Sequence, residues 1–230
     1  MIKSLISVFI VISFVATSQA SPIPPAPNLN VKAYVVMDFD SKMILASSNK
    51  DLTLPPASIT KMMTAYVAFT ELKEKNISLD EEILVSKKAW KTGGSKMFIE
   101  VGKRVKVRDI LQGVITVSGN DASVALAEHI SGDEKTFATY MNQMATNLGL
   151  SNTNYTNATG LPSDSLYTTA EDIAIYQGLL LQSFQIYINF IPPNLSNLMR
   201  LSNTPGINCC LWMIMLMELK QVLLRPQVTA

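Results

Sequence analysis

The chain reads Pro55-Pro56-Ala57-Ser58-Ile59-Thr60-Lys61 immediately before a long apolar run, Met62–Leu72. Prolines end a preceding regular element and push their neighbours into extended geometry, so a helix is expected to begin at the serine. Residues three apart lie on one helix face, which puts the Ser58 hydroxyl and the Lys61 amine on the same side. An amine deprotonated by desolvation can take the serine proton, and the helix N-terminus adds positive potential where an oxyanion would form. The stretch therefore predicts an acyl-transfer centre.

A Ser-x-x-Lys pattern is short, and the chain contains a second copy, Ser47-Ser48-Asn49-Lys50. That copy falls in the polar stretch Ser47–Asp51, with no apolar helix behind it, which indicates a solvated turn. The helix after Ser58 differs because it is apolar on nearly all sides and is therefore expected to be buried. A lysine one turn into a buried helix needs a reason to be there, and catalysis supplies one.

A second motif, Ser118-Gly119-Asn120, separates the apolar segment Ile110–Val117 from Asp121–Ala127. This order reads as helix, short loop, helix. Asn120 and Asp121 are both good N-cap residues, so the motif has a structural interpretation as the start of the second helix. Its functional interpretation places a hydroxyl and an amide beside the nucleophile, one for proton relay and one for a substrate amide. The two interpretations are compatible.

Both motifs, in this order and separation, resemble the low-molecular-mass penicillin-binding proteins of the serine-type D-Ala-D-Ala carboxypeptidase family (peptidase family S11), which is related to the β-lactamases. The resemblance runs from about Ala33 to about Tyr187. It includes Met97-Phe98, the stretch Met141–Leu150 and the stretch Asn157–Leu161. It implies an enzyme that removes terminal D-Ala from peptidoglycan stem peptides, with β-lactams as covalent inhibitors and no cofactor or metal.

The resemblance also implies a role for each motif residue. Ser58 would be the acylated nucleophile and Lys61 its general base, while Ser118 would relay protons and Asn120 would bind the substrate. A class A β-lactamase is an alternative, but those enzymes carry Asp where this chain has Gly119, and they use a deacylating Glu in a separate loop. A third alternative is a non-catalytic truncated remnant.

The expected elements give an α/β fold of the α+β kind. A hairpin is predicted from Ala33–Met37 and Met43–Ala46, joined by the turn Asp38–Lys42. Extended segments are predicted at Glu82–Ser86 and Arg104–Val107, followed by helices over Arg108–Val117, Asp121–Ile130 and Glu134–Asn147, and by one that starts at Thr168 or Thr169 with capping-box spacing to Glu171. The resemblance implies a β-lactamase/transpeptidase-like antiparallel sheet flanked by helices, with the C-terminal strands missing from this sequence.

The family's third motif, a Lys-Thr-Gly, follows its Ser-x-Asn, whereas Lys91-Thr92-Gly93 precedes Ser118 here and is interpreted as unrelated. After Tyr187 the chain has few charges and no clear period. With suitable codons, Met217–Val222 read from the third base gives Gly-Val-Lys-Thr-Gly. The hypothesis is that a frameshift near Tyr187 leaves residues 188–230 as an out-of-frame tail behind a partial catalytic domain, residues 21–187.

The N-terminus has the pattern of a secretory signal, residues 1–20, with Lys3, the apolar stretch Leu5–Val15 and the small-residue site Ser18-Gln19-Ala20. Export to the periplasm or cell envelope fits an enzyme of cell-wall peptides. The family often adds a β-rich domain and an amphipathic C-terminal membrane anchor. Neither is visible here, so attachment to a membrane surface is not expected without that anchor.

Composition excludes several classes of protein. The net charge of +1 argues against a nucleic-acid partner. Cys209 and Cys210 are adjacent and too close for an ordinary disulfide with each other, so no disulfide framework or Cys-based metal site follows. His129 is the single histidine, late in a predicted helix where it favours the C-terminal end of the dipole, and no Ser-His-Asp triad is expected.

Overall fold

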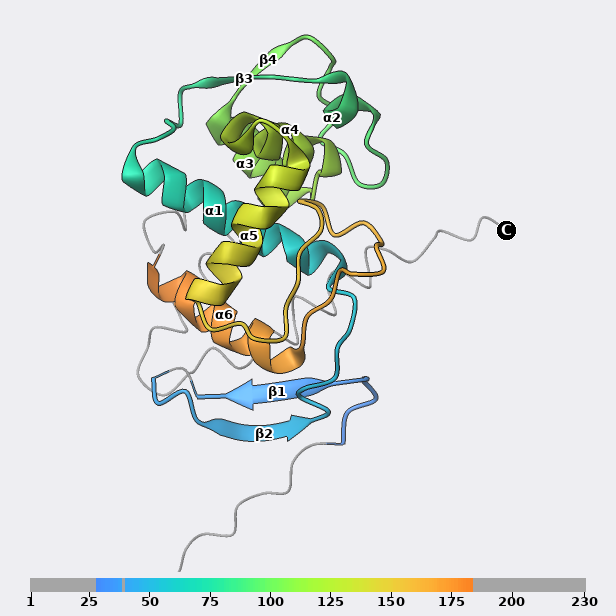
Figure 1. Ribbon diagram of the computed structural model, residues 1–230, viewed down its shortest axis with the longest axis vertical. Helices are drawn as coiled ribbons and strands as arrows, with labels where there is room; N and C mark the ends of the chain where they lie inside the picture. Colours follow the sequence, from blue (N-terminus) through green and yellow to red (C-terminus); the bar gives the residue numbers. More distant parts are fainter. Residues whose placement is uncertain (1–27, 39, 184–230) are drawn as a thin grey trace, which may run out of the picture.

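The computed structural model describes residues 28–38 and 40–183 of the 230-residue chain. Two antiparallel hairpins lie at opposite ends of the described part, with helices between them (Figure 1). In chain order the elements are β1 (Tyr34–Met37), β2 (Ile44–Ser48), the 3-10 turn η1 (Ala57–Ile59), α1 (Thr60–Glu74), β3 (Glu82–Leu84), α2 (Lys87–Lys91), β4 (Arg104–Lys106), α3 (Val107–Thr116), α4 (Asn120–Ser131), α5 (Glu134–Asn147) and α6 (Ala170–Ser183). This mixture of helices and antiparallel strands confirms the predicted α+β class.

The first hairpin forms where the sequence predicts it. β1 and β2 pair antiparallel, and β2 continues to Ser48, two residues beyond the predicted end at Ala46. In the connecting turn the Asp38 carboxylate accepts hydrogen bonds from the Ser41 hydroxyl at 2.6 Å and the Ser41 N–H at 2.8 Å. These bonds favour the charged carboxylate and lower the pKa of Asp38. The turn chemistry therefore sets the hairpin locally.

The second hairpin, β3 with β4, has a short helix between its strands that the sequence does not predict. Pairing continues past the strands, because Val85 N–H donates to Lys103 O and Gly102 N–H donates to Val85 O, each at 2.9 Å. α2 begins after Ser86, whose hydroxyl accepts the Ala89 N–H at 3.0 Å as an N-cap. α2 has only five residues, too few to show a helical period.

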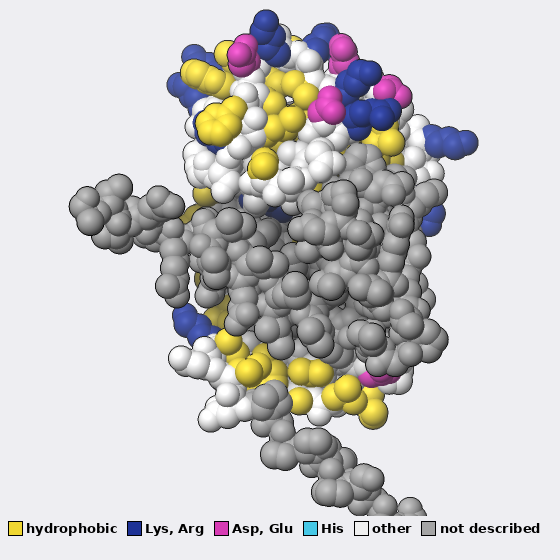
Figure 2. Space-filling view, turned by 180° about the vertical axis from the view of Figure 1, so that it is seen from behind, with side chains coloured by type: hydrophobic (Ala, Val, Ile, Leu, Met, Phe, Trp, Pro, Cys, Tyr) yellow, Lys and Arg dark blue, Asp and Glu magenta, His cyan; other side chains and the backbone are white. Residues whose placement is uncertain are grey.

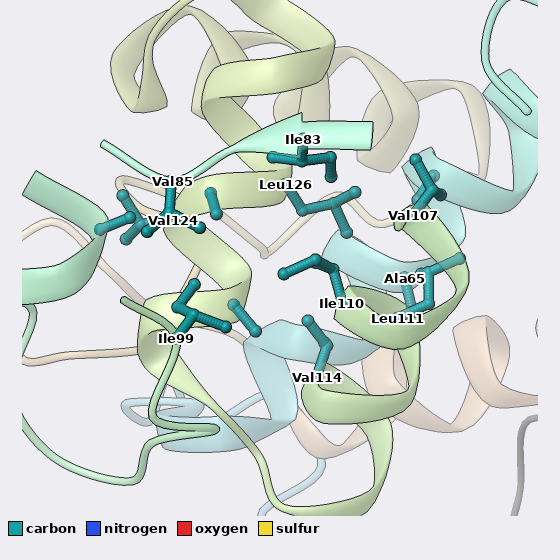
Figure 3. Packing of buried hydrophobic residues seen from close by; sticks show 14 of the residues in the cluster. Ala65, Ile83, Val85, Ile99, Val107, Ile110, Leu111, Val114, Val124 and Leu126 are labelled. Atoms are coloured by element: carbon teal, nitrogen blue, oxygen red, sulfur yellow. The ribbon is translucent and has the colours of Figure 1, made fainter. Parts of the chain in front are cut away.

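α1 crosses the middle of the described part and is buried on opposite faces. Ala65, Ala68 and Phe69 belong to one core cluster, with α3, α4 and β3, part of which is shown in Figure 3. Met63 and Val67 belong to a second cluster, with α5, α6 and the segment before α6. Burial on both faces explains why Met62–Leu72 is apolar nearly all round, and it confirms the prediction of a buried helix.

The predicted helices α3 to α6 are present, with two corrections at their N-termini. Neither Asn120 nor Asp121 is an N-cap: α4 begins at Asn120, and its N-cap is Gly119, without a side-chain cap bond. Asp121 is engaged elsewhere, as described below. α6 begins at Ala170, and the Thr169 hydroxyl accepts the Asp172 N–H at 3.1 Å. The cap of α6 is therefore Thr169, one residue after Thr168, the first residue of the predicted capping box.

Several predictions fall outside the described residues. These are the signal segment 1–20, the domain boundary at 187, the out-of-frame tail 188–230 and the missing C-terminal strands of the sheet. Across residues 28–38 and 40–183, none of the helices combines the length and apolar character needed to span a bilayer.

Candidate active site

Ser58 lies in the 3-10 turn η1, directly before α1, as the proline lead-in predicts. Pro56 is buried, and Ile59 N–H donates to Pro56 O at 3.0 Å, which closes the turn. Ala57 has a φ of +46°, in the left-handed region that residues with a Cβ rarely adopt. The serine is therefore presented by a strained turn at the entrance of a buried helix.

Lys61, in the first turn of α1, is buried, with 4% of its surface exposed. Its Nζ donates a hydrogen bond to the Thr159 carbonyl oxygen at 2.6 Å. One turn later, the Thr64 hydroxyl donates to the Ala158 carbonyl oxygen at 2.7 Å. The start of α1 is therefore bound to the segment Asn157–Leu161, which the sequence indicates only through the family resemblance.

The segment Asn157–Leu161 is ordered by one side chain. The Asn157 Oδ1 accepts the Thr159 N–H at 3.1 Å, the Thr159 hydroxyl at 2.9 Å and the Gly160 N–H at 2.7 Å. Gly160 has a φ of +81°, and a Cβ built on it would lie 1.8 Å from the Ala57 carbonyl oxygen. The close approach of the two backbones requires glycine, and it fixes this segment against the turn that carries Ser58.

The second motif is held in an unusual backbone geometry. Ser118 has a φ of +55°, and its hydroxyl is buried without a hydrogen-bond partner among the described residues. Buried hydroxyls are usually paired, and those of Thr60 and Tyr176 are likewise buried without a described partner. The place of Ser118 in the second motif is therefore what makes its oxygen a candidate for proton relay. Asn120 is 5% exposed, and its Nδ2 donates to the Gly93 carbonyl oxygen at 2.7 Å.

Asp121 is fully buried, and its carboxylate binds the backbone N–H groups of the segment Met97–Ile99. Its carboxylate accepts the Met97 and Phe98 N–H groups at 2.9 Å and the Ile99 N–H at 3.3 Å. A fourth donor is the Ala122 N–H at 2.9 Å. Backbone donors replace the water that the charge loses on burial, so Asp121 needs no cation. The sequence offered it only as an N-cap, since its true partners lie far away along the chain.

Asn157–Leu161 connects the two motifs. On one side Gly160 contacts Ala57, next to Ser58. On the other, a Cβ built on Gly94 would lie 2.5 Å from the Asn120 Nδ2 and 3.9 Å from a methyl group of Leu161. The structure therefore gathers both predicted motifs around one segment, and it adds the loop at Gly93 and Gly94 as a further wall.

The stretch Lys91-Thr92-Gly93 contributes to the candidate site through a backbone atom only. Gly93 contributes its carbonyl oxygen to Asn120, while the Thr92 hydroxyl donates to the Lys88 carbonyl oxygen at 2.9 Å within the α2 end. Lys91 is exposed as the last residue of α2. These contacts do not depend on a Lys-Thr-Gly sequence.

The remaining candidates take structural positions. Ser47 and Ser48 are exposed in β2, and Lys50 pairs with Glu171 and Asp51, at 2.5 Å and 3.1 Å. The His129 Nε2 lies 3.1 Å from a Glu81 carboxylate oxygen. Among the described residues there is no group of three or more His, Cys, Asp or Glu side chains that could hold a metal ion.

Comparison with known proteins identifies the family to which this chain belongs. The model of the D-alanyl-D-alanine carboxypeptidase family, peptidase S11, matches residues 18–191. The chain belongs to this family. The D-alanyl-D-alanine carboxypeptidase DacA of Haemophilus influenzae is 43% identical over 152 residues, which cover 65% of this chain and 39% of that protein. DacF of Bacillus subtilis, with the same enzyme description, is 40% identical over 151 residues, 66% of this chain and 39% of that protein.

A solved structure confirms the fold. The crystal structure of the D-alanyl-D-alanine carboxypeptidase DacD from Francisella tularensis matches with a TM-score of 0.69 and 39% sequence identity. The match covers 75% of this chain and 42% of that one. The chain thus spans about two fifths of the length of the curated relatives it matches.

Proposed function

We propose that this protein is a serine-type D-Ala-D-Ala carboxypeptidase homologue that acts on peptidoglycan stem peptides through an acyl-enzyme on Ser58, and that the 230-residue chain is impaired in this reaction. The observation that carries the proposal is the burial of Lys61, three residues after a serine in a strained turn. The buried Nζ is held by the Thr159 carbonyl oxygen one helical turn from the serine, where acyl transfer needs a general base.

In the proposed reaction the Ser58 Oγ attacks the carbonyl carbon of the penultimate D-Ala while its proton passes to the Lys61 amine. The C–N bond to the terminal D-Ala breaks, and that amino acid leaves with a proton relayed through the Ser118 hydroxyl. Water then attacks the ester and returns the serine. Asn120, already fixed by Gly93, would hold the substrate amide. A β-lactam would acylate the same oxygen.

The family relationship supports a location in the cell envelope, and the signal pattern refines this to export into the periplasm. We assign residues 1–20 to the signal peptide, 21–187 to a partial catalytic domain and 188–230 to an out-of-frame tail. The support for each boundary is the sequence pattern. Peptidoglycan stem peptides and β-lactams are the proposed partners.

The experiment uses mass spectrometry after a long incubation of the purified chain with a penicillin. Ser58→Ala should abolish the covalent adduct, whereas Ser47→Ala, in the exposed second Ser-x-x-Lys, should leave it unchanged. An adduct located on Ser47 or Ser118 would overturn the assignment of the nucleophile. Rapid nitrocefin turnover would favour a β-lactamase, and a wild-type chain without any adduct would favour a non-catalytic remnant.

A further inference from the structure

Positive charge is concentrated in one segment of this nearly neutral chain. Residues 87–108 contain eight of the nineteen basic residues and a single acidic one, Glu100, a net charge of +7. The whole chain carries +1, so the rest carries −6. Such an asymmetry within one chain marks a surface for an anionic partner.

These cations lie at the surface, at one end of the molecule. The segment comprises α2, the following loop, β4 and the first turn of α3, around the end opposite the β1–β2 hairpin (Figure 1). From behind, Figure 2 shows Lys and Arg side chains around this end, with apolar side chains and several Asp and Glu side chains between them. The cationic surface consists of Lys87, Lys88, Lys91, Lys96, Lys103, Arg104, Lys106 and Arg108, of which all but the half-buried Lys96 are exposed.

Most of this charge is not neutralised within the described residues. Lys88 pairs with Glu134 at 2.8 Å, and Lys106 and Arg108 share Asp80 at 3.4 Å and 2.8 Å. The other five cations have no carboxylate within 4.0 Å in the described part of the chain. The surface therefore keeps cations that a polyanion can reach.

Two aromatic side chains are exposed within the same segment. Phe98 is 82% exposed and Trp90 is 44% exposed. Phe98 has a φ of +65°, strained for an aromatic residue, and the Asp121 carboxylate holds its N–H in that position. A strained backbone that presents an aromatic ring to solvent indicates a binding surface rather than core packing.

The cationic surface adjoins the candidate active site. Asn120 bonds to the loop after α2 twice, from its Nδ2 to Gly93 O and from its N–H to Ser95 O, both at 2.7 Å. Lys91 and Lys96 flank these two contacts in the sequence, and the Lys96 Nζ donates to the Trp90 carbonyl oxygen at 2.8 Å. A polymer bound to the surface would therefore pass beside the residue proposed to hold the substrate.

We infer that this cationic surface is an accessory binding site for polymeric peptidoglycan, separate from the site of acyl transfer. The identity of the polymer rests on the proposed function; the existence of a polyanion site does not. Repeated stem peptides bring free carboxylates at regular intervals, and the sugar rings offer apolar faces on which exposed aromatic rings stack. A lipid bilayer fits less well. A flat bilayer on this surface would cover the loop that borders Asn120, whereas a polymer strand would pass beside it.

The test is co-sedimentation of the full chain with purified insoluble peptidoglycan at low and high salt. Lys87→Glu, Lys91→Glu, Lys103→Glu and Arg104→Glu are combined in one variant. The matched control combines Lys32→Glu, Lys73→Glu, Lys75→Glu and Lys135→Glu, all exposed elsewhere. The first variant should bind about tenfold more weakly or worse, and the control should bind like the wild type. High salt should remove the difference.

Three further arms decide the partner. Ser58→Ala should sediment like the wild type, which separates this site from the proposed catalysis. Peptidoglycan with its carboxylates amidated should bind the wild type as weakly as untreated peptidoglycan binds the first variant. Equal sedimentation of the two quadruple variants, both folded by circular dichroism, would overturn the inference. Loss of binding to phosphatidylglycerol vesicles alone, with peptidoglycan binding unchanged, would also overturn it, in favour of a membrane.

Discussion

The Lys61 Nζ and the Thr159 carbonyl oxygen, 98 residues apart in the chain, lie 2.6 Å apart in the structure. This bond joins the first turn of α1 to the segment that also contacts Ala57 and, through Leu161, lies near Asn120. The amine therefore has a structural partner as well as a proposed chemical role. The first prediction separates those two contributions at Lys61.

Lys61→Arg tests the base. An arginine keeps the positive charge and the capacity to donate to Thr159 O, but it does not supply a neutral nitrogen at ordinary pH. Covalent labelling by a fluorescent penicillin should slow by about a hundred- to ten-thousand-fold, the usual contribution of a general base. Urea denaturation should show that the fold is retained. Lys50→Arg, in the second Ser-x-x-Lys, is the control, and equal labelling of the two variants would remove Lys61 from the base role.

Gly160→Ala tests the contact that positions the Ser58 turn. A methyl group there would lie 1.8 Å from Ala57 O, whereas Gly132, with nearly the same φ of +80°, has no atom within 4 Å of its Cβ position. Gly132→Ala carries only the backbone penalty, about 1–2 kcal/mol. Gly160→Ala adds the clash and should cost about 3 kcal/mol or more of unfolding free energy, measured in urea. Similar losses for the two variants would show that the close approach is unimportant.

Asp121→Asn tests the buried carboxylate. Asparagine retains one acceptor oxygen but turns an N–H₂ group toward the Met97–Ile99 amides, which are donors themselves. The unfolding free energy should fall by about 2–4 kcal/mol, since charged hydrogen bonds are lost and donors are left unpaired. Amide exchange should accelerate at Met97, Phe98 and Ile99. Asp109→Asn, exposed in the first turn of α3, should change neither quantity.

Local spacing accounts for what the sequence could predict. The bounds of α5, Glu134–Asn147, agree with the prediction because the Asp133 cap and Gly149 both lie next to the helix in the chain. One turn of helix likewise predicts that Ser58 and Lys61 lie close together at the start of α1, and their proposed roles stay predictions. The sequence does not predict the bond to the Thr159 carbonyl or the partners of Asp121, because those bonds join residues distant in sequence and involve backbone atoms, which leave no residue signature. The sequence does not predict α2 because five residues are too few to show a helical period.

The final prediction is that the 230-residue polypeptide itself is a poor enzyme. The family resemblance assigns to a late Lys-Thr-Gly strand the site for the substrate's terminal carboxylate and one oxyanion donor. In this sequence Lys-Thr-Gly occurs only at 91–93, where Gly93 acts through its carbonyl oxygen. Loss of one oxyanion donor costs about a hundred- to a thousand-fold in rate. Release of D-Ala from a diacetyl-Lys-D-Ala-D-Ala peptide by residues 21–230 should be slower than that by the Haemophilus influenzae relative by at least that factor.

Restoring the alternate reading frame after Tyr187 should then increase penicillin labelling and unfolding free energy together, since the same strand would complete both the site and the sheet. Ser58→Ala in the restored chain is the control, because it should keep the gain in stability and lose the labelling.

The gene's nucleotide sequence gives the sharpest check of the frameshift hypothesis. If its alternate frame does not encode Lys-Thr-Gly opposite Met217–Val222, the frameshift hypothesis is wrong, and rates of D-Ala release equal to those of the relative would refute the predicted impairment.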